Sequence, residues 1–254
     1  MTDQPRILIV GGGSGIGDCI TDFLVRKHNA KVIVQSLHVS DRVERLARQG
    51  QIILVHGDAT KTKVLDQTFN AVQESLGGLD ALVITMGVIG EIETVSRMDM
   101  SKMRAAFEVN LLVPVQLCQQ YLPLLKKTHG RIIVLSSAAD NEVKYAGWSP
   151  YCSSKAALTR FIQVLGHEED DVRIFGVYPG LTRTPMVTDL VSGRFRGKMK
   201  DDEIAEFQRR DRDGEIEPPE WTANVVAKLA VSAVHAGDSG SVRWYHEIDP
   251  NYKG

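Results

Sequence analysis

The sequence predicts an α/β protein in which helices flank a doubly wound parallel sheet of about seven strands. Two observations predict this fold class. Short β-branched runs alternate with longer amphipathic stretches along the whole chain, which is the order expected of strand–helix–strand units. Runs such as 7–10 and 132–135 are apolar on both faces, as a strand must be when helices cover both sides of a parallel sheet.

The predicted elements form one domain over residues 1–254. Strands are expected at 6–10, 31–35, 52–56, 81–85, 131–136, 172–177 and 242–245, and helices at 15–26, 40–48, 61–76, 100–127, 150–165 and 221–234. The segment 185–219 interrupts the alternation and is rich in Arg, Lys, Asp and Gly, yet keeps some apolar residues. We expect it to form a mobile lid with one or two short helices over a cleft, rather than a disordered insertion.

The composition excludes several classes of partner. Of the 254 residues, 43% are hydrophobic and 24% charged, with a formal net charge of -2, so no basic excess favours nucleic acid. The three cysteines form no C-x-x-C pair, which indicates free thiols in a reducing compartment and no metal site. Neither a signal peptide nor a run of about 18 apolar residues is present. We therefore expect a cytoplasmic protein without a membrane span.

A glycine-rich turn directly follows the first predicted strand. Gly11, Gly15 and Gly17 are spaced G-x-x-x-G-x-G, and the first predicted helix begins within this segment. Glycine allows positive φ and a close approach of the backbone to a diphosphate, which the N–H groups of a helix N-terminus then bind. The turn, with Ser14 and Ile16, therefore predicts a Rossmann-type dinucleotide site, although a plain tight turn also uses glycine. A P-loop is excluded because no Lys–Ser/Thr pair follows the third glycine.

The end of the second predicted strand indicates which nicotinamide cofactor is bound. Folds that bind NAD place a carboxylate there for the ribose 2′-hydroxyl, but residues 35–38 read Gln-Ser-Leu-His. Ser36, His38 and Arg42 could instead accept a 2′-phosphate, so NADP is favoured and NAD is possible. Asp58, after the third strand, could contact the adenine amino group or cap the following helix.

A tyrosine and a lysine supply a candidate acid–base pair. Tyr151 and Lys155 are four residues apart on a predicted helix and so project from the same face. A lysine ammonium and an oxidised nicotinamide would favour the phenolate and lower the pKa of the tyrosine toward neutrality. Ser137 ends the preceding strand, where a hydroxyl could bind a carbonyl. Asn110 lies within a predicted helix, where a buried Asn could kink the helix to hold a water molecule for proton transfer.

These motifs resemble those of the short-chain dehydrogenase/reductase family over essentially the whole chain, and segment 147–158 is closest to the sepiapterin reductase and fungal benzil reductase-like branch. The resemblance implies a catalytic tetrad of Asn110, Ser137, Tyr151 and Lys155. It also implies further contacts with the cofactor, in which Asn110, Tyr151 and Lys155 take part together with Ala59, Thr85, Gly87, Pro179, Gly180, Thr182 and Thr184.

The chain departs from the family pattern at four places. Residues 84–87 read Ile-Thr-Met-Gly instead of the usual Asn-Asn-Ala-Gly, and Val10 replaces a threonine. Ser14 stands where NADP-binding members often have a basic residue. Ser137 precedes Tyr151 by one residue more than expected, so we expect the loop 138–150 to bulge.

The predicted function is hydride transfer between a nicotinamide cofactor, NADPH by preference, and a ketone, diketone or secondary alcohol, with Tyr151 as general acid and base. Tyr145, Trp148 and Met186 are candidate contacts to an apolar substrate. Glu247 or Asp249 could anchor a pterin-like ring, or be exposed acids near the C-terminus. The family further implies a homodimer or homotetramer. Two alternatives have no catalysis: a dinucleotide-binding sensor or scaffold, and an interaction protein built on the same fold.

Overall fold

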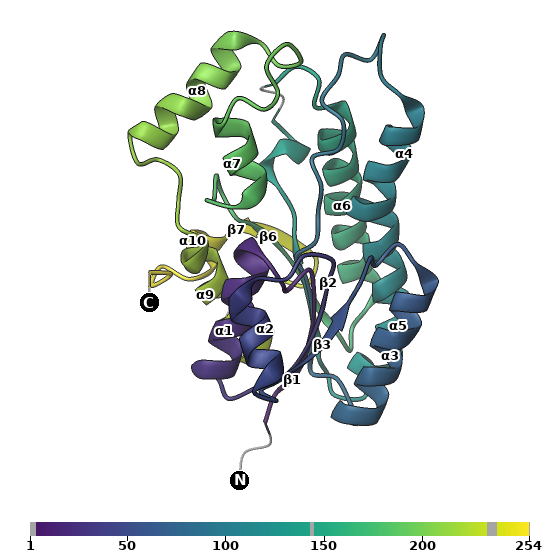
Figure 1. Ribbon diagram of the computed structural model, residues 1–254. Helices are drawn as coiled ribbons and strands as arrows, with labels where there is room; N and C mark the ends of the chain where they lie inside the picture. The colour runs from purple at the N-terminus through teal and green to yellow at the C-terminus, as the bar shows by residue number, and fades with distance from the viewer. Residues whose placement is uncertain (1–3, 143–144, 233–237, 254) are drawn as a thin grey trace.

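The computed structural model describes residues 4–142, 145–232 and 238–253. In this part of the chain seven parallel strands form one sheet in the order β3-β2-β1-β4-β5-β6-β7 (Figure 1). The predicted fold class is confirmed, and every predicted strand is present with ends within one residue of those expected. The strands are β1 (Arg6–Val10), β2 (Lys31–Ser36), β3 (Ile52–His56), β4 (Ala81–Ile84), β5 (Arg131–Leu135), β6 (Arg173–Tyr178) and β7 (Ser241–Trp244).

Helices cover both faces of the sheet because its strands alternate their buried side chains between two cores. Ile7 and Ile9 of β1 pack with one group of helices, whereas Leu8 and Val10 pack with the other. The first layer contains α1 (Gly15–Arg26), α2 (Asp41–Arg48), α9 (Pro219–Val231) and α10 (Tyr245–Ile248). The second contains α3 (Thr62–Leu76), α5 (Val113–Lys126) and α6 (Ser149–Glu168), with α4 (Met100–Phe107) packed against α6.

The helix predicted at 100–127 is not continuous. A π-helical turn, η1 (Glu108–Leu112), separates α4 from α5. Pro114 lies four residues after Asn110 and lacks an N–H group, so the ordinary α-helical hydrogen bond to the Asn110 carbonyl cannot form. The kink expected at Asn110 is therefore present, in the form of a π turn.

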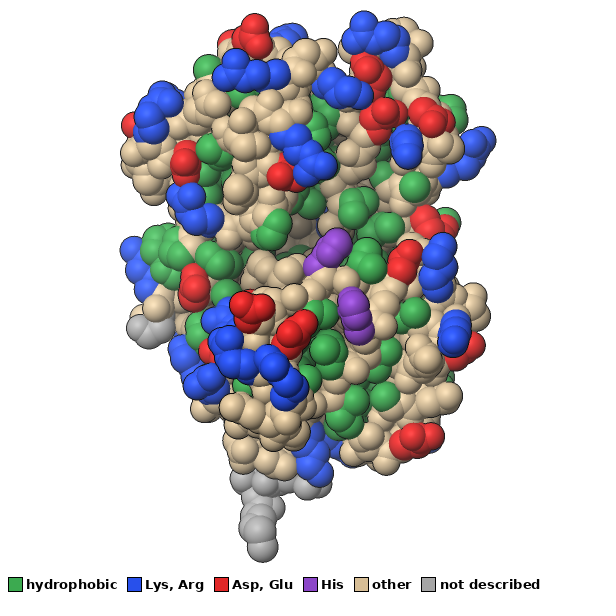
Figure 2. Space-filling view, in the orientation of Figure 1, with side chains coloured by type: hydrophobic (Ala, Val, Ile, Leu, Met, Phe, Trp, Pro, Cys, Tyr) green, Lys and Arg blue, Asp and Glu red, His purple; other side chains and the backbone are tan. Residues whose placement is uncertain are grey.

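The segment 185–219 contains two helices, α7 (Pro185–Val191) and α8 (Asp201–Arg212). Both lie beyond the carboxyl ends of the strands, at the top of Figure 1. Leu190, Ile204 and Phe207 from this segment bury their side chains in a third apolar cluster together with Ile92 and Trp148. An indentation separates the segment from the body of the molecule, with apolar side chains along it (Figure 2). The prediction of one or two helices in this segment is confirmed, and the mobility of a lid stays a prediction.

Three smaller expectations concern the thiols, a membrane span and the end of one helix. Cys19, Cys118 and Cys152 are free, as predicted. No helix in the described ranges is both long and apolar enough to cross a membrane. The predicted helix 221–234 ends at Val231 in the structure, and its last two residues lie outside the described part of the chain.

Tyr121 leads to a prediction about stability. Its side chain is fully buried beside Phe69, with ring centroids 5.7 Å apart, and its hydroxyl has no hydrogen-bond partner among the described residues. A buried polar group without a partner has lost its hydration without compensation. Tyr121→Phe should therefore raise the free energy of unfolding by about 1 kcal/mol, measured by urea denaturation. A destabilised variant would show that the hydroxyl is satisfied.

Candidate active site

A cavity of about 340 Å³ opens at the carboxyl edge of the sheet, beneath α7 and α8. It brings together side chains from segments far apart in the sequence, because parallel strands place their carboxyl ends at one edge. The lining residues are Ser137, Ala138, Ala139, Glu142, Tyr145, Trp148, Tyr151, Cys152, Pro179, Gly180, Leu181, Met186, Val187, Leu190, Phe207, Arg210, Glu215, Glu217, Trp244 and His246.

Two side chains of the predicted tetrad, Ser137 and Tyr151, line this cavity. Ser137 caps the short helix η2 (Ala138–Asp140), where its Oγ accepts a hydrogen bond from the Ala139 N–H at 3.3 Å. Burial raises the pKa of the Tyr151 phenol, and the hydrogen bond with Ser137 opposes that rise. In the protein alone, burial has the largest effect on the pKa of this phenol, and the lowering expected from Lys155 together with an oxidised nicotinamide stays a prediction.

Lys155 lies one helical turn beyond Tyr151 and only 4% of its surface is exposed. Its Nζ donates a hydrogen bond to the Leu135 carbonyl at the end of β5, over 3.0 Å. Burial lowers the pKa of the amine to about 8, and the charge of Asp140 opposes this shift. The amine therefore changes its charge close to neutral pH instead of near 10.5.

The Asn110 side chain joins the π turn to two other segments. Its Oδ1 accepts from the Val88 N–H at 2.8 Å, and its Nδ2 donates to the Val88 carbonyl at 2.8 Å and to Ser154 Oγ at 3.0 Å. Both polar atoms of the fully buried Asn110 amide thus have hydrogen-bond partners. The side chain itself fixes the loop after β4 against α6, rather than facing the cavity.

Asp140 is a feature that the sequence analysis missed. Its Oδ2 accepts hydrogen bonds from Thr159 Oγ1 at 2.5 Å and from the Tyr178 hydroxyl at 2.7 Å. Ser136 Oγ lies 2.7 Å from Thr159 Oγ1. Thr159 could have been noticed from its spacing, since Tyr151, Lys155 and Thr159 recur every four residues on one helix face. Asp140 gave no such signal, because its partners depend on how the loop folds.

Aromatic rings line one part of the cavity. The rings of Tyr145 and Trp148 lie 4.8 Å apart, and the Tyr145 ring lies 4.8 Å from that of Phe207 on α8. The Trp148 ring meets that of Tyr151 edge-on at 5.8 Å. Tyr145, Trp148 and Met186 all line the cavity, where the sequence placed them, and their contact with a substrate stays a prediction. Phe207 was missed because it comes from the irregular segment.

Charged side chains line the other part of the cavity and were also missed. Arg210 and Glu215 form an ion pair at 3.1 Å. Glu217 lies deeper, with its Oε2 buried and without a hydrogen-bond partner in the part of the chain described. Burial raises the pKa of the Glu217 carboxyl, opposed by a hydrogen bond with Tyr245. These residues follow α8 or come from it, so local sequence patterns could not place them near Tyr151.

The glycine turn has the form that a diphosphate requires. Gly11 has a φ of 90°, and a Cβ there would collide with the Met86 backbone. A Cβ on Gly17 would collide with the Gly11 carbonyl. Ser14 occupies the N-cap position of α1, but its side chain makes no capping hydrogen bond, so the first N–H groups of the helix remain available for an anion. Ile16 packs in the core and can contribute only its backbone to this site.

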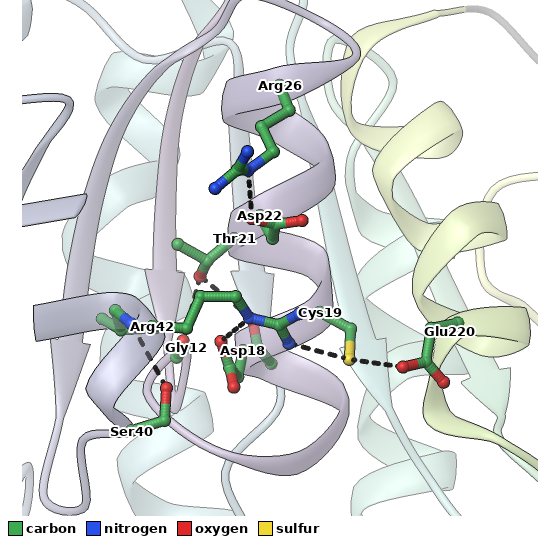
Figure 3. A network of polar contacts seen from close by, with 11 residues as sticks. Gly12, Asp18, Cys19, Thr21, Asp22, Arg26, Ser40, Arg42 and Glu220 are labelled. Atoms are coloured by element: carbon green, nitrogen blue, oxygen red, sulfur yellow. Dashed lines mark hydrogen bonds and ion pairs between the residues drawn. The ribbon is translucent and has the colours of Figure 1, made fainter. Parts of the chain in front are cut away.

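The side chains proposed for a 2′-phosphate are already engaged, with one exception. Ser36 Oγ accepts from the Gly13 N–H at 3.2 Å and donates to the His38 carbonyl at 2.8 Å. Arg42 reaches from α2 to α1, where it pairs with Asp18 at 2.8 Å and donates to the Cys19 sulfur at 3.2 Å (Figure 3). His38 is exposed. The Ser36 hydroxyl thus already has two hydrogen-bond partners, and its contact with a 2′-phosphate stays a prediction, whereas the Arg42 side chain is one-third exposed.

The other residues predicted to contact the cofactor follow β3 and β4. Asp58 Oδ1 accepts from the backbone N–H and the hydroxyl of Thr60, both at 2.9 Å, so it closes a turn and is not the N-cap, which is Lys61. Ala59 packs in the core. Thr85 donates to the Val10 carbonyl at 3.3 Å.

Next to Lys155, Gly87 leaves open space, since a Cβ there would lie 3.5 Å from both Lys155 Nζ and Asn110 Oδ1. This close approach to two residues of the tetrad agrees with its predicted place in the site.

The loop after β6 connects the cavity with the glycine turn. Pro179 and Gly180 line the cavity, while the Thr184 side chain lies over Gly15. Thr184 Oγ1 caps α7. Thr182 is buried and donates to the Pro179 carbonyl at 2.6 Å, so its hydroxyl holds the shape of the loop.

Two other expectations concern the C-terminal acids and the loop 138–150. Glu247 accepts from the Trp244 N–H, Asp249 pairs with Lys228 at 2.7 Å, and neither lines the cavity, so they anchor no ring. The loop begins with η2; residues 143–144, on which its predicted bulge depends, lie outside the described residues. No cluster of three or more His, Cys, Asp or Glu side chains suited to a metal occurs within the described ranges.

Comparison with known proteins shows which proteins the chain resembles. A family model described as short chain dehydrogenase matches residues 5–194. An uncharacterized oxidoreductase of Saccharomyces cerevisiae is 29% identical over 243 residues, which cover 95% of each chain. A benzil reductase ((S)-benzoin forming) of the same yeast is 26% identical over 252 residues, again 95% of each. The crystal structure of a short-chain dehydrogenase/reductase from S. cerevisiae has a TM-score of 0.90 at 28% identity and covers 97% of this chain and 98% of its own.

The lowered pKa of Lys155 makes stability depend on pH. The unfolded chain holds the lysine proton up to about pH 10.5, whereas the folded chain releases it near pH 8, so stability should rise with pH between these values. Relative to Lys155→Met, which cannot titrate, the free energy of unfolding should increase by roughly 2–3 kcal/mol across this window. Urea denaturation at several pH values measures the difference. A constant difference would contradict the lowered pKa.

Proposed function

This chain belongs to the short-chain dehydrogenase family and is an NAD(P)-dependent oxidoreductase, and we propose that it reduces ketones or diketones with Tyr151 as the general acid. One observation carries the proposal: Ser137 and Tyr151 line the same cavity as Pro179 and Gly180, and the loop that begins there brings Thr184 over Gly15 of the glycine turn. The same geometry serves the reverse oxidation of a secondary alcohol.

Each residue has a distinct task in the proposed reaction. A bound nicotinamide would supply the hydride to the carbonyl carbon, from its pro-S side as the family implies. Ser137 Oγ and the Tyr151 hydroxyl hold the carbonyl oxygen, and Tyr151 donates its proton as negative charge develops there. Burial keeps this phenol protonated, which suits a proton donor.

Lys155 and Asn110 restore the proton. The Lys155 amine changes charge near pH 8, so it can pass a proton toward Tyr151 and regain one from solvent. Because Pro114 has no N–H group, the Asn110 carbonyl lacks its α-helical partner, and we assign to it the water molecule that links Lys155 to bulk solvent. A non-catalytic sensor would have no use for this set of groups.

The cavity supports an aromatic carbonyl compound as the substrate class. Its aromatic wall places flat apolar surfaces beside Tyr151, where ring stacking adds to the burial of apolar area. A volume of about 340 Å³ suits a molecule of one or two rings. The benzil reductase relative makes an aromatic diketone the first compound to test.

We also favour NADPH as the cofactor, and a homodimer or homotetramer in the cytoplasm. No carboxylate follows β2 to bind a 2′-hydroxyl; the exposed His38 follows this strand, and Arg42 lies in the first turn of α2. Association of subunits is supported by apolar side chains that are about half exposed on neighbouring elements of one layer: Met100 on α4, Leu112 on η1 and Val164 on α6.

Tyr151→Phe should lower kcat for benzil reduction at least a hundredfold, because the ring remains while the proton donor is lost. Cofactor binding, measured as the rise in Tm with NADPH, should be largely retained. Tyr145→Phe removes a hydroxyl from the same cavity and is the matched control. Unchanged turnover in Tyr151→Phe would refute the proposed role.

Arg42→Ala should lower kcat/KM for NADPH about tenfold and leave the value for NADH nearly unchanged, because only NADPH carries a phosphate for the guanidinium to bind. Arg45→Ala, on the exposed face of the same helix, is the control. Equal losses with both cofactors would show that Arg42 stabilises α1 through Asp18 without reading the phosphate.

A further inference from the structure

Asp140 lies three residues after Ser137 and outside the tetrad, yet its side chain bonds to two elements that surround the site. Thr159 on α6 and Tyr178 at the end of β6 both donate to its Oδ2. These two elements also carry the acid–base pair and the loop that lines the cavity. Asp140 therefore joins the segment of Ser137 to the helix of Tyr151 and Lys155.

The hydroxyl groups around this carboxyl group suit a negative charge on it. Thr159 has a single hydroxyl proton and gives it to Asp140, so Ser136 must donate to Thr159 across their 2.7 Å contact. Tyr178 gives its only hydroxyl proton to Asp140 as well. Asp140 Oδ2 therefore accepts hydrogen bonds from two neutral hydroxyl groups, which is the arrangement that stabilises a carboxylate.

The charge of Asp140 is incompletely compensated. Its Oδ1 is buried and has no hydrogen-bond partner among the described residues. The Lys155 ammonium, the cation of this part of the site, bonds to the Leu135 carbonyl and not to Asp140. A buried charge without an ion pair acts over several ångströms through a medium of low polarity.

This charge acts on both members of the acid–base pair. It opposes the effect of burial on the pKa of Lys155 and adds to the rise of the pKa of Tyr151. The other groups that face Tyr151 are the Ser137 hydroxyl, which lowers its pKa, and the Cys152 thiol, which raises it. Glu142 also lines the cavity.

We propose that Asp140 is a positioning residue whose partly buried negative charge holds the proton on the Tyr151 phenol and thereby extends carbonyl reduction to higher pH. The inference rests on the proposed acid role of Tyr151. Its physical basis is simple: removing the proton from Tyr151 would place a second negative charge near Asp140, and like charges in a buried site oppose each other. The hydroxyls of Ser136, Thr159 and Tyr178 keep the carboxylate in place.

The test compares two variants that differ in charge. Asp140→Asn removes the charge and keeps an acceptor oxygen, whereas Tyr178→Phe removes one hydrogen bond and keeps the charge. The titration of Tyr151 is followed directly by ¹³C NMR of protein containing [¹³Cζ]tyrosine, and Tyr151→Phe assigns the signal. Asp140→Ser replaces the amide variant should that one fail to fold.

The titration midpoint of Tyr151 should fall by roughly one pH unit in Asp140→Asn and should not fall in Tyr178→Phe. The alkaline limb of kcat for benzil reduction should move by the same amount. An unmoved midpoint in Asp140→Asn, or an equal fall in both variants, would overturn the proposal. A protein that reduces no carbonyl compound would refute the proposed function, while the NMR titration would still decide the effect of Asp140.

Discussion

The arrangement of the site depends on the buried amide of Asn110. Its hydrogen bonds to Val88 and Ser154 join the loop after β4, the π turn and α6, and so fix Lys155, the next residue after Ser154. A fully buried amide is tolerated only when its polar atoms are satisfied, so loss of any one segment would leave it uncompensated. The π turn between α4 and α5 thus interrupts a regular helix at the residue that holds α6, the helix of Tyr151 and Lys155, in place.

Burial has the largest effect on the pKa values of Lys155 and Tyr151, which lie on the helix that the Asn110 hydrogen bonds hold in place. The same exclusion from water lowers the pKa of Lys155 and raises that of Tyr151, so the two pKa values move apart and the lysine ammonium becomes the stronger acid of the pair. The segment with α7 and α8 contributes to this exclusion through the cluster around Trp148 and Phe207. The proposed preference for an aromatic substrate and the proposed tuning of the acid therefore depend on one packing arrangement.

Local patterns predicted the strands, the glycine turn and the meeting of Ser137 with Tyr151, because these follow from periodicity, backbone freedom and the common edge of parallel strands. They could not predict which side chains were already engaged. Ser36 looked available for a phosphate, but it bonds to Gly13 and His38. Asp140 attracted no attention, because its role depends on long-range partners at Thr159 and Tyr178 that no spacing rule connects.

The central claim is that this cavity passes a hydride from a nicotinamide to a carbonyl carbon while Tyr151 donates the proton. The most direct measurement is the fate of deuterium after incubation with benzil and NADPH that carries deuterium at the pro-S position of C4, followed by mass spectrometry of both products. The account predicts one deuterium on the carbinol carbon of benzoin and none in the NADP⁺. Formation of no benzoin, or deuterium retained in the NADP⁺, would contradict it.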